Sequence, residues 1–173
     1  MHIRPYQPDD GMLYKQVRLA SLADAPYAFG EGSFAEESAL PDTYWHELAA
    51  QLGGADPRWQ DRCVGYVVLD GDDVCGTAIC YLCPEVPGHA YFAAAWVAPR
   101  CRRRGLGRRL VDEAIAWAAA HSAAHLRLWV DDTNPEAVDF YRALDFTATG
   151  ESRPISEDAD VHQSCFERRL AAE

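Results

Sequence analysis

The sequence lacks any apolar run long enough to cross a membrane. Its longest uninterrupted apolar stretch is 90–98, whereas a membrane-spanning helix needs about 20 such residues. Residues 1–5 contain no apolar signal core. We therefore expect no membrane association and a cytoplasmic location.

The cysteines do not complete a recognisable metal-binding pattern. Cys80 and Cys83 have the spacing of a metal or redox pair, but no second pair accompanies them, and residues three apart in a strand face opposite ways. We interpret the six cysteines as free thiols and predict no bound metal. Cys101 lies among arginines, so we expect it to be the thiol that reacts first.

Acidic residues are missing from one short stretch of an otherwise acidic chain. Six arginines lie between Arg100 and Arg109 with no Asp or Glu among them, although the net charge of the chain is −11. A strongly negative total argues against a general nucleic-acid binder. A basic stretch in an acidic chain fits an anionic ligand together with an amine-bearing second substrate.

No repeat, low-complexity segment or linker divides the 173 residues, so we expect 1–173 to form one domain. Apolar periodicity predicts the order strand, two helices, three strands, helix, strand, helix and two strands. The predicted strands after the first are 63–69, 74–82, 90–97, 126–130, 146–149 and 164–170, with a loop at 153–161 between the last two. The predicted helices begin near 11, 41, 106 and 134.

The arginine stretch contains a glycine turn between a predicted strand and a predicted helix. Gly105 and Gly107 have no side chain to keep a phosphate away from the backbone. The helix after the turn directs unpaired N–H groups and the positive end of its dipole at a bound anion. A dinucleotide oxidoreductase is disfavoured, because the Gly-x-Gly-x-x-Gly spacing is absent.

Two blocks carry a family resemblance. The run Arg102-Arg103-Arg104-Gly105-Leu106-Gly107 resembles the (Gln/Arg)-x-x-Gly-x-(Gly/Ala) signature of the GNAT superfamily of N-acetyltransferases, and residues 134–146 resemble a later block of bacterial members. The resemblance implies an α+β GNAT fold. Its mixed, mostly antiparallel sheet would have about seven strands, a central splay and about four flanking helices.

The resemblance also implies an activity, namely direct transfer of the acetyl group of acetyl-CoA to a primary amine in a ternary complex. The amine would be a small molecule or a peptide. Tyr141 matches the family tyrosine that gives a proton to the departing thiolate. The residues implied to bind acetyl-CoA are Val97, Arg102, Arg103, Arg104, Gly105, Leu106, Gly107, Arg108, Asn134, Ala137 and Tyr141.

Two positions depart from the family pattern. Asp145 stands where a glycine usually supplies a left-handed helix cap, a conformation that aspartate can adopt at a modest cost. Tyr91 stands where some members have a glutamate base, and 90–97 contains no carboxylate. A base, if one is needed, would be His89, Glu31, Glu85 or Asp131, or water alone.

The missing glutamate leaves a second function open, that of a non-catalytic acyl-CoA-binding or regulatory domain. The sequence also leaves open the amine acceptor, the length of the acyl chain and a homodimer, which would be isologous.

Overall fold

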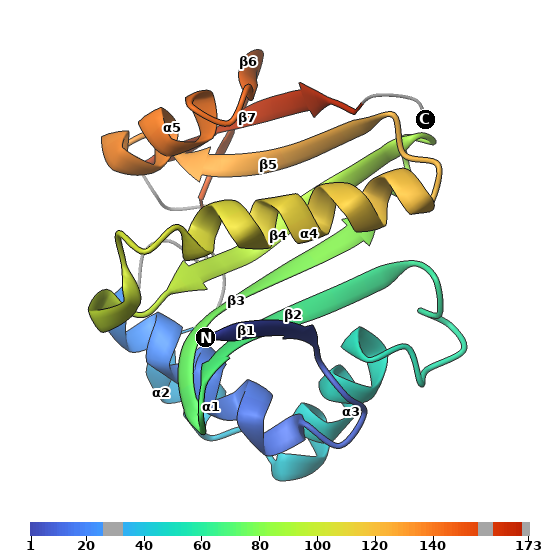
Figure 1. The fold of residues 1–173 in the computed structure, drawn as a ribbon, viewed down its shortest axis with the longest axis vertical. Helices are drawn as coiled ribbons and strands as arrows, with labels where there is room; N and C mark the ends of the chain where they lie inside the picture. The colour runs from blue at the N-terminus through green and yellow to red at the C-terminus, as the bar shows by residue number, and fades with distance from the viewer. Residues whose placement is uncertain (26–32, 156–160, 171–173) are drawn as a thin grey trace.

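The computed structural model describes residues 1–25, 33–155 and 161–170. Its strands form one sheet of seven in the order β1-β2-β3-β4-β5-β7-β6 (Figure 1). All neighbouring strands are antiparallel except β4 and β5, which are parallel. This arrangement confirms the predicted α+β fold with a mixed, mostly antiparallel sheet.

The strands and helices occur in the predicted order, and most of their bounds lie close to the predicted ones. The strands are β1 His2–Pro5, β2 Cys63–Asp70, β3 Asp73–Leu82, β4 His89–Val97, β5 His125–Asp131, β6 Thr147–Pro154 and β7 His162–Arg169. The helices are α1 Gly11–Asp24, α2 Phe34–Ser38, α3 Asp42–Leu52, α4 Leu106–Ala120 and α5 Pro135–Arg142, with a 3-10 turn η1 at Pro99–Cys101. None of the helices in the described ranges is long and apolar enough to span a membrane.

The described residues include five α-helices rather than about four, because α2 forms between the helices predicted to begin near 11 and 41. Ser33 caps this helix. Its hydroxyl accepts a hydrogen bond from the Glu36 N–H, and the Glu36 carboxylate accepts one from the Ser33 N–H. This reciprocal Ser-x-x-Glu pattern is visible in the sequence and could have predicted the helix.

β6 extends five residues past the predicted end at Thr149, to Pro154. Its pairing with β7 is irregular between Ala148 and Ser152 and then resumes as far as Pro154. Every residue of β6 is exposed, so no apolar alternation marks its second half.

Helices cover both faces of the sheet, as neighbouring residues of β2 demonstrate. A Cβ on Gly65 would meet Leu52 of α3 at 3.1 Å, whereas Tyr66 donates its hydroxyl to the Glu113 carbonyl of α4 at 3.4 Å. Successive side chains of a strand point to opposite faces. We call the two sides of the sheet the α3 face and the α4 face.

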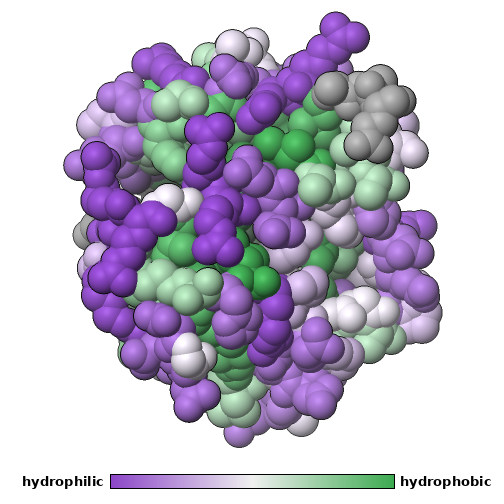
Figure 2. Space-filling model, viewed as in Figure 1, coloured by the Kyte–Doolittle hydropathy of each residue, from purple (hydrophilic) through white to green (hydrophobic). Residues whose placement is uncertain are grey.

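The core fills the space between the sheet and these helices. Leu110, Val111 and Ala114 of α4 and Trp45 of α3 are fully buried, whereas hydrophilic side chains cover most of the surface in view (Figure 2). Cys101 is also buried, with its Sγ beside that of Cys75. Its burial removes the basis for expecting it to react first, because the thiol points from η1 into the core.

β4 and β5 pair only at their beginnings. Their register runs from His89–His125 to Tyr91–Arg127 and then stops, although both strands continue. The register of β4 with β3 shifts beyond Ala93, and Ala94 has a φ of 50°. A bulge of this kind bends and twists its strand. It turns the remainder of β4 away from β5 and opens the predicted splay (Figure 1).

Replacing Ala94 with glycine tests whether the bulge is strained. We expect Ala94→Gly to raise the free energy of unfolding by about 0.5–1 kcal/mol, because positive φ costs an L-residue roughly 1–2 kcal/mol that glycine avoids. Ala93→Gly is the matched control, because Ala93 has no positive φ, and it should lower the free energy of unfolding by about 0.5–1 kcal/mol. Urea unfolding measures both changes, and the same sign for both would contradict the strained bulge.

Candidate functional site

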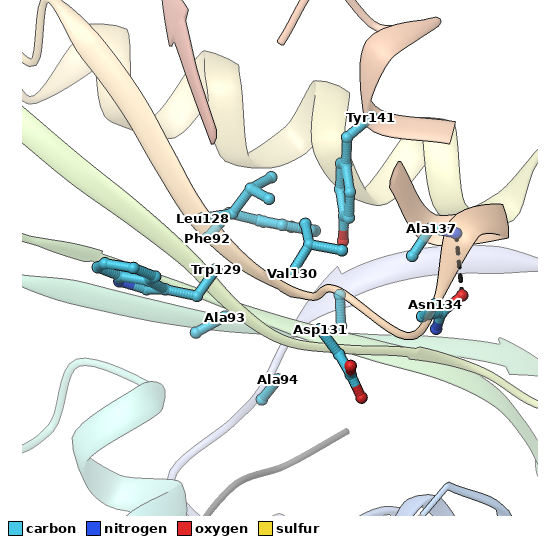
Figure 3. A pocket seen from close by; sticks show the side chains of 11 residues that line it. Phe92, Ala93, Ala94, Leu128, Trp129, Val130, Asp131, Asn134, Ala137 and Tyr141 are labelled. Atoms are coloured by element: carbon cyan, nitrogen blue, oxygen red, sulfur yellow. Dashed lines mark hydrogen bonds between the residues drawn. The ribbon is translucent and has the colours of Figure 1, made fainter. Parts of the chain in front are cut away.

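A cavity of about 120 Å³ lies in the gap between β4 and β5 (Figure 3). Both strands and α5 line it. The lining residues are Phe92, Ala93, Ala94, Ala95, Leu128, Trp129, Val130, Asp131, Asn134, Ala137 and Tyr141. These residues include neighbours in sequence whose side chains point to opposite faces of the sheet, so residues of both faces border the cavity.

Register and contacts place individual residues on each face. The Cys80 Sγ lies 3.8 Å from the Ala114 carbonyl oxygen of α4, so Cys80 is on the α4 face. Phe92 is the register partner of Cys80 and therefore lies on the same face. Ala90 pairs with Leu126 on the same face, and alternation along β5 then places Val130 there too. Asp131 consequently lies on the α3 face. In Figure 3, Tyr141 and Asp131 point to opposite sides of the β5 ribbon.

Tyr141 projects from α5 into the cavity. Its ring packs edge-on against Phe92, Phe140 and Phe146, with centroid distances of 6.4, 5.0 and 5.8 Å. Its hydroxyl points toward Val130 (Figure 3) and has no hydrogen-bond partner among the residues that the structure describes. Burial raises the pKa of Tyr141 well above its ordinary value, so the phenol is protonated at neutral pH. It can donate a proton to a group that enters the cavity.

Both ends of α5 have identifiable cap residues. The Asn134 side-chain oxygen accepts a hydrogen bond from the Ala137 N–H at 3.0 Å, which leaves the amide N–H₂ as a donor toward the cavity. Ala137, with its small side chain, forms part of the cavity wall. After the helix, Asp145 has a φ of 63°, which confirms that aspartate takes the left-handed position usual for glycine.

The glycine turn connects β4 to α4. Gly105 has a φ of 76° and precedes the first turn of α4, where no side chain caps the N–H groups. A Cβ on Gly105 would meet no atom within 4 Å, so open space lies over this backbone. Within the described ranges the exposed side chains of Arg103, Arg104 and Arg108 make no ion pair. Open N–H groups and unpaired cations together fit an anionic group such as a diphosphate.

Gly107 and Leu106 have structural roles in addition. A Cβ on Gly107 would lie 3.1 Å from the Phe140 ring, so its missing side chain allows α4 to approach α5 closely. Sequence reasoning assigned this glycine to phosphate binding alone and missed the packing role. The Leu106 side chain is buried in the core, and only its backbone is available to a ligand.

Arg102 is engaged within the protein. Its guanidinium donates to the Val97 carbonyl at 3.0 Å and pairs with Asp24 at the end of α1. Asp24 also accepts a hydrogen bond from the Trp96 indole at 2.8 Å. Arg102 therefore ties the end of β4 to α1, a contact that no sequence pattern indicated.

The Val97 N–H is directed toward the gap. The next residue, Ala98, donates its N–H to the Cys75 carbonyl of β3 at 2.9 Å. Because successive N–H groups of a strand alternate in direction, that of Val97 points away from β3. It is available to an extended ligand lying between β4 and β5.

Asp131 is the candidate base that lines the cavity. Its Oδ1 accepts hydrogen bonds from the Thr133 N–H and hydroxyl at 2.8 and 2.7 Å. These bonds fix the carboxylate at the end of β5 and leave Oδ2 for another partner.

The other candidate bases lie elsewhere. His89 is at the start of β4, where it faces Glu167 at 3.5 Å, and Glu85 is exposed in the β3–β4 connection. Neither lines the cavity. Glu31 lies outside the described residues. Tyr91, at the position of the family glutamate, stacks on Tyr81 with ring centroids 5.6 Å apart.

Known proteins share this architecture. Residues 30–146 match the family model described as Acetyltransferase (GNAT) family. An acetyltransferase of the GNAT family from Streptococcus pneumoniae is 18% identical with a TM-score of 0.76, and the match covers 98% of this chain and 99% of that chain. A GCN5-related N-acetyltransferase from Kribbella flavida is 22% identical with a TM-score of 0.73, covering 98% and 97%.

A third structure is that of yncA from Salmonella typhimurium, solved with its cofactor acetyl-CoA. It is 16% identical with a TM-score of 0.73, and the match covers 100% of this chain and 95% of that chain. These structures share the fold, and the family model spans more than half of the sequence. The chain therefore belongs to the GNAT acetyltransferase family.

Proposed function

We propose that this protein is an N-acetyltransferase that moves the acetyl group of acetyl-CoA directly to a primary amine in a ternary complex. The observation that carries the proposal is the gap between β4 and β5. It gives Tyr141 on one face and Asp131 on the other access to one cavity (Figure 3). A thioester in this gap would have its sulfur near Tyr141 and its carbonyl carbon open to an amine on the α3 face.

The transfer requires one bond to form and one to break. The amine nitrogen bonds to the carbonyl carbon of the thioester, and the carbon–sulfur bond breaks. The leaving thiolate takes a proton from Tyr141, which is protonated beforehand because burial raises its pKa, and solvent restores that proton after the products leave. In this proposal the Val97 N–H donates to the thioester oxygen as negative charge develops there.

Asp131 takes the proton that the amine loses. It stands at the cavity edge on the face opposite Tyr141, where a carboxylate can compensate for the glutamate missing from β4. With Oδ1 held by Thr133, Oδ2 is available to the amine or to a bridging water. The acidic balance of the whole chain also favours a cationic acceptor.

The glycine turn holds the diphosphate of acetyl-CoA in this proposal. Backbone N–H groups of residues 103–108 and the dipole of α4 supply the main attraction. The free guanidinium groups of Arg103, Arg104 and Arg108 add charge, and Arg102 acts by fixing the turn against β4 and α1. Asn134 and Ala137 border the pantetheine arm.

Adding a methyl group at Gly105 tests the diphosphate site. We expect Gly105→Ala to weaken acetyl-CoA binding by roughly 100-fold, because the Cβ occupies the space over the N–H groups. Gly54→Ala is a matched control, since Gly54 also has positive φ, at 74°, and open space around it, but lies after α3. Calorimetric titration with acetyl-CoA measures the affinity of each variant. Equal affinities in the two variants would remove the turn from the binding site.

Removing the Tyr141 hydroxyl tests the proton donor. We expect Tyr141→Phe to lower kcat by about 10²–10³ with little change in acetyl-CoA affinity. Because burial raises the pKa of Tyr141, the wild-type phenol stays protonated over roughly pH 6 to 9, and the defect should persist throughout that range. Tyr66→Phe, another buried phenol with a raised pKa but outside the cavity, should leave kcat unchanged. Wild-type turnover by Tyr141→Phe would refute the role.

Neutralising Asp131 tests the base. We expect Asp131→Asn to lower kcat/KM for the amine by about 10²-fold while the KM for acetyl-CoA stays near normal. Raising the pH should recover part of the loss, because more of the amine is already deprotonated in solution. The neighbouring exposed Asp132→Asn is the control and should behave as wild type. A pH-independent defect would contradict a role as base.

Thiol release measured over a panel of primary amines decides the overall function. Saturable acetyl-CoA binding without turnover on any amine would favour the non-catalytic acyl-CoA-binding domain instead.

A further inference from the structure

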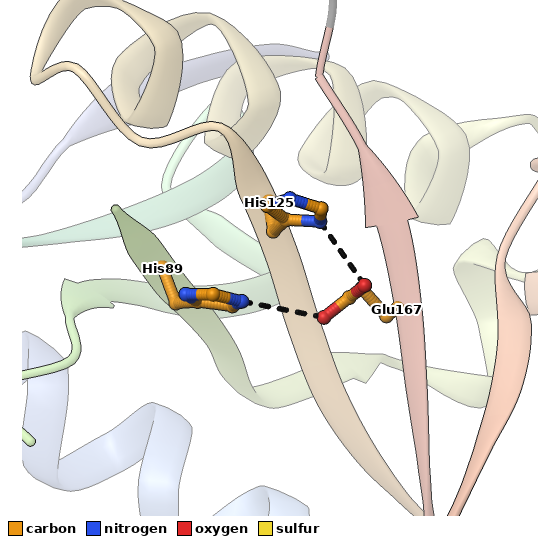
Figure 4. Close-up of side chains that lie close together, drawn as sticks. All are labelled: His89, His125 and Glu167. Atoms are coloured by element: carbon orange, nitrogen blue, oxygen red, sulfur yellow. Dashed lines mark ion pairs between the residues drawn. The ribbon is translucent and has the colours of Figure 1, made fainter. Parts of the chain in front are cut away.

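A second cluster of chemically active side chains lies on the α3 face where β4 and β5 are still paired. His89 and His125 are register partners at the starts of these strands, and Glu167 reaches them from β7 (Figure 4). Their potential ligand atoms, one from each side chain, all lie within 4.8 Å of one another. The two imidazole rings stack at 4.7 Å with an interplanar angle of 13°.

The distances are close to those of a metal centre. His125 Nδ1 lies 3.0 Å from Glu167 Oε1, and His89 Nε2 lies 3.5 Å from Glu167 Oε2. A tetrahedral Zn²⁺ site with bonds of about 2.0–2.2 Å places its ligand atoms roughly 3.3–3.5 Å apart. The two distances involve different oxygens of Glu167, so one carboxylate oxygen and the two imidazole nitrogens, which lie within 4.8 Å of one another, would reach a common centre by side-chain rotation.

Among the described residues, the ligand atoms of both histidines make no hydrogen bond, and each faces the Glu167 carboxylate. His89 Nδ1 lies 3.4 Å from the Pro87 carbonyl, which can only accept, so the ring proton is assigned to Nδ1 and a neutral His89 presents a lone pair at Nε2. Metal-binding histidines commonly use a backbone carbonyl in this way. His125 Nδ1 is buried and makes no hydrogen bond, although it faces the Glu167 carboxylate. A cation bound between His89 Nε2, His125 Nδ1 and the Glu167 carboxylate would give each of these groups a partner.

The local charge and exposure also suit a cation. Arg127 pairs with Glu167 at 2.6 Å and with Glu151 at 3.1 Å, so two carboxylates surround one guanidinium. The side chains of His89, His125 and Glu167 are 17%, 30% and 23% exposed. Partial exposure provides an entry path and room for a water molecule as a further ligand.

We propose that His89, His125 and Glu167 bind one divalent transition-metal ion of the Zn²⁺ class, with water completing the coordination. Two imidazoles and one carboxylate are a typical ligand set for such ions. The ion links β4, β5 and β7 at the closed end of the splay. Asp131 lies six residues further along β5, about 20 Å away. The site is thus separate from the acetyl-transfer cavity and does not depend on the proposed function.

Metal titration of the full chain tests the proposal. After removal of metal with a chelator, the protein is titrated with ZnCl₂ by calorimetry and with CoCl₂ by visible absorption. We expect one ion per chain and Co²⁺ bands of nitrogen and oxygen ligation without thiolate charge transfer, which separates this site from the six cysteines.

Two variants and one control locate the ion. His89→Phe keeps an aromatic ring stacked on His125 but removes a ligand, and His125→Gln removes the second; each should weaken Zn²⁺ binding by roughly 100-fold or more. His162→Gln, at an exposed position of β7, is the control and should bind as wild type. Zn²⁺ should raise the thermal midpoint of the wild type and the control but not of either ligand variant.

Three outcomes would overturn the site. They are wild-type protein that binds no stoichiometric ion, ligand variants that bind as tightly as the control, and Co²⁺ spectra dominated by thiolate ligation. Circular dichroism of each variant shows that it is folded before its affinity is compared.

Discussion

The end of hydrogen bonding between β4 and β5 is the constraint on which the rest of the structure depends. Buried backbone groups normally find partners, and beyond Tyr91 and Arg127 these two strands no longer supply them to each other. The bulge at Ala94 produces the separation while β4 stays paired with β3. An extended ligand can then occupy the place of a strand, with Val97 as its backbone partner.

The same gap joins two faces that an intact sheet would keep apart. Tyr141 comes from a helix on the α4 face and Asp131 from a strand residue on the α3 face, yet both line one cavity. Close contact between Gly107 and Phe140 sets the approach of α5 to α4 and so the position of Tyr141. At the open end of the gap, the Arg102–Asp24 pair ties β4 to α1. At the closed end, His89 and His125 meet Glu167.

Local patterns predicted much of the fold and part of the site. The glycine turn, the Asn134 cap and the left-handed Asp145 all follow from backbone geometry within a few residues. Burial of Cys101 and the packing role of Gly107 were not predicted, because both depend on residues distant in sequence. The His89, His125 and Glu167 cluster was missed for the same reason, since its members come from three separate strands and form no spacing motif.

The sequence by itself determined the order of the elements, the basic turn before α4 and the capping of α5, because apolar periodicity, glycine and capping side chains act over one or two turns of chain. Only the tertiary structure decided which side chains share the cavity. It placed Asp131 at the gap and His89 far from it, although each lies one residue outside a strand that the sequence predicted. The physical reason is that strand register and the position of one bulge, rather than residue type, set which side chains meet across the sheet.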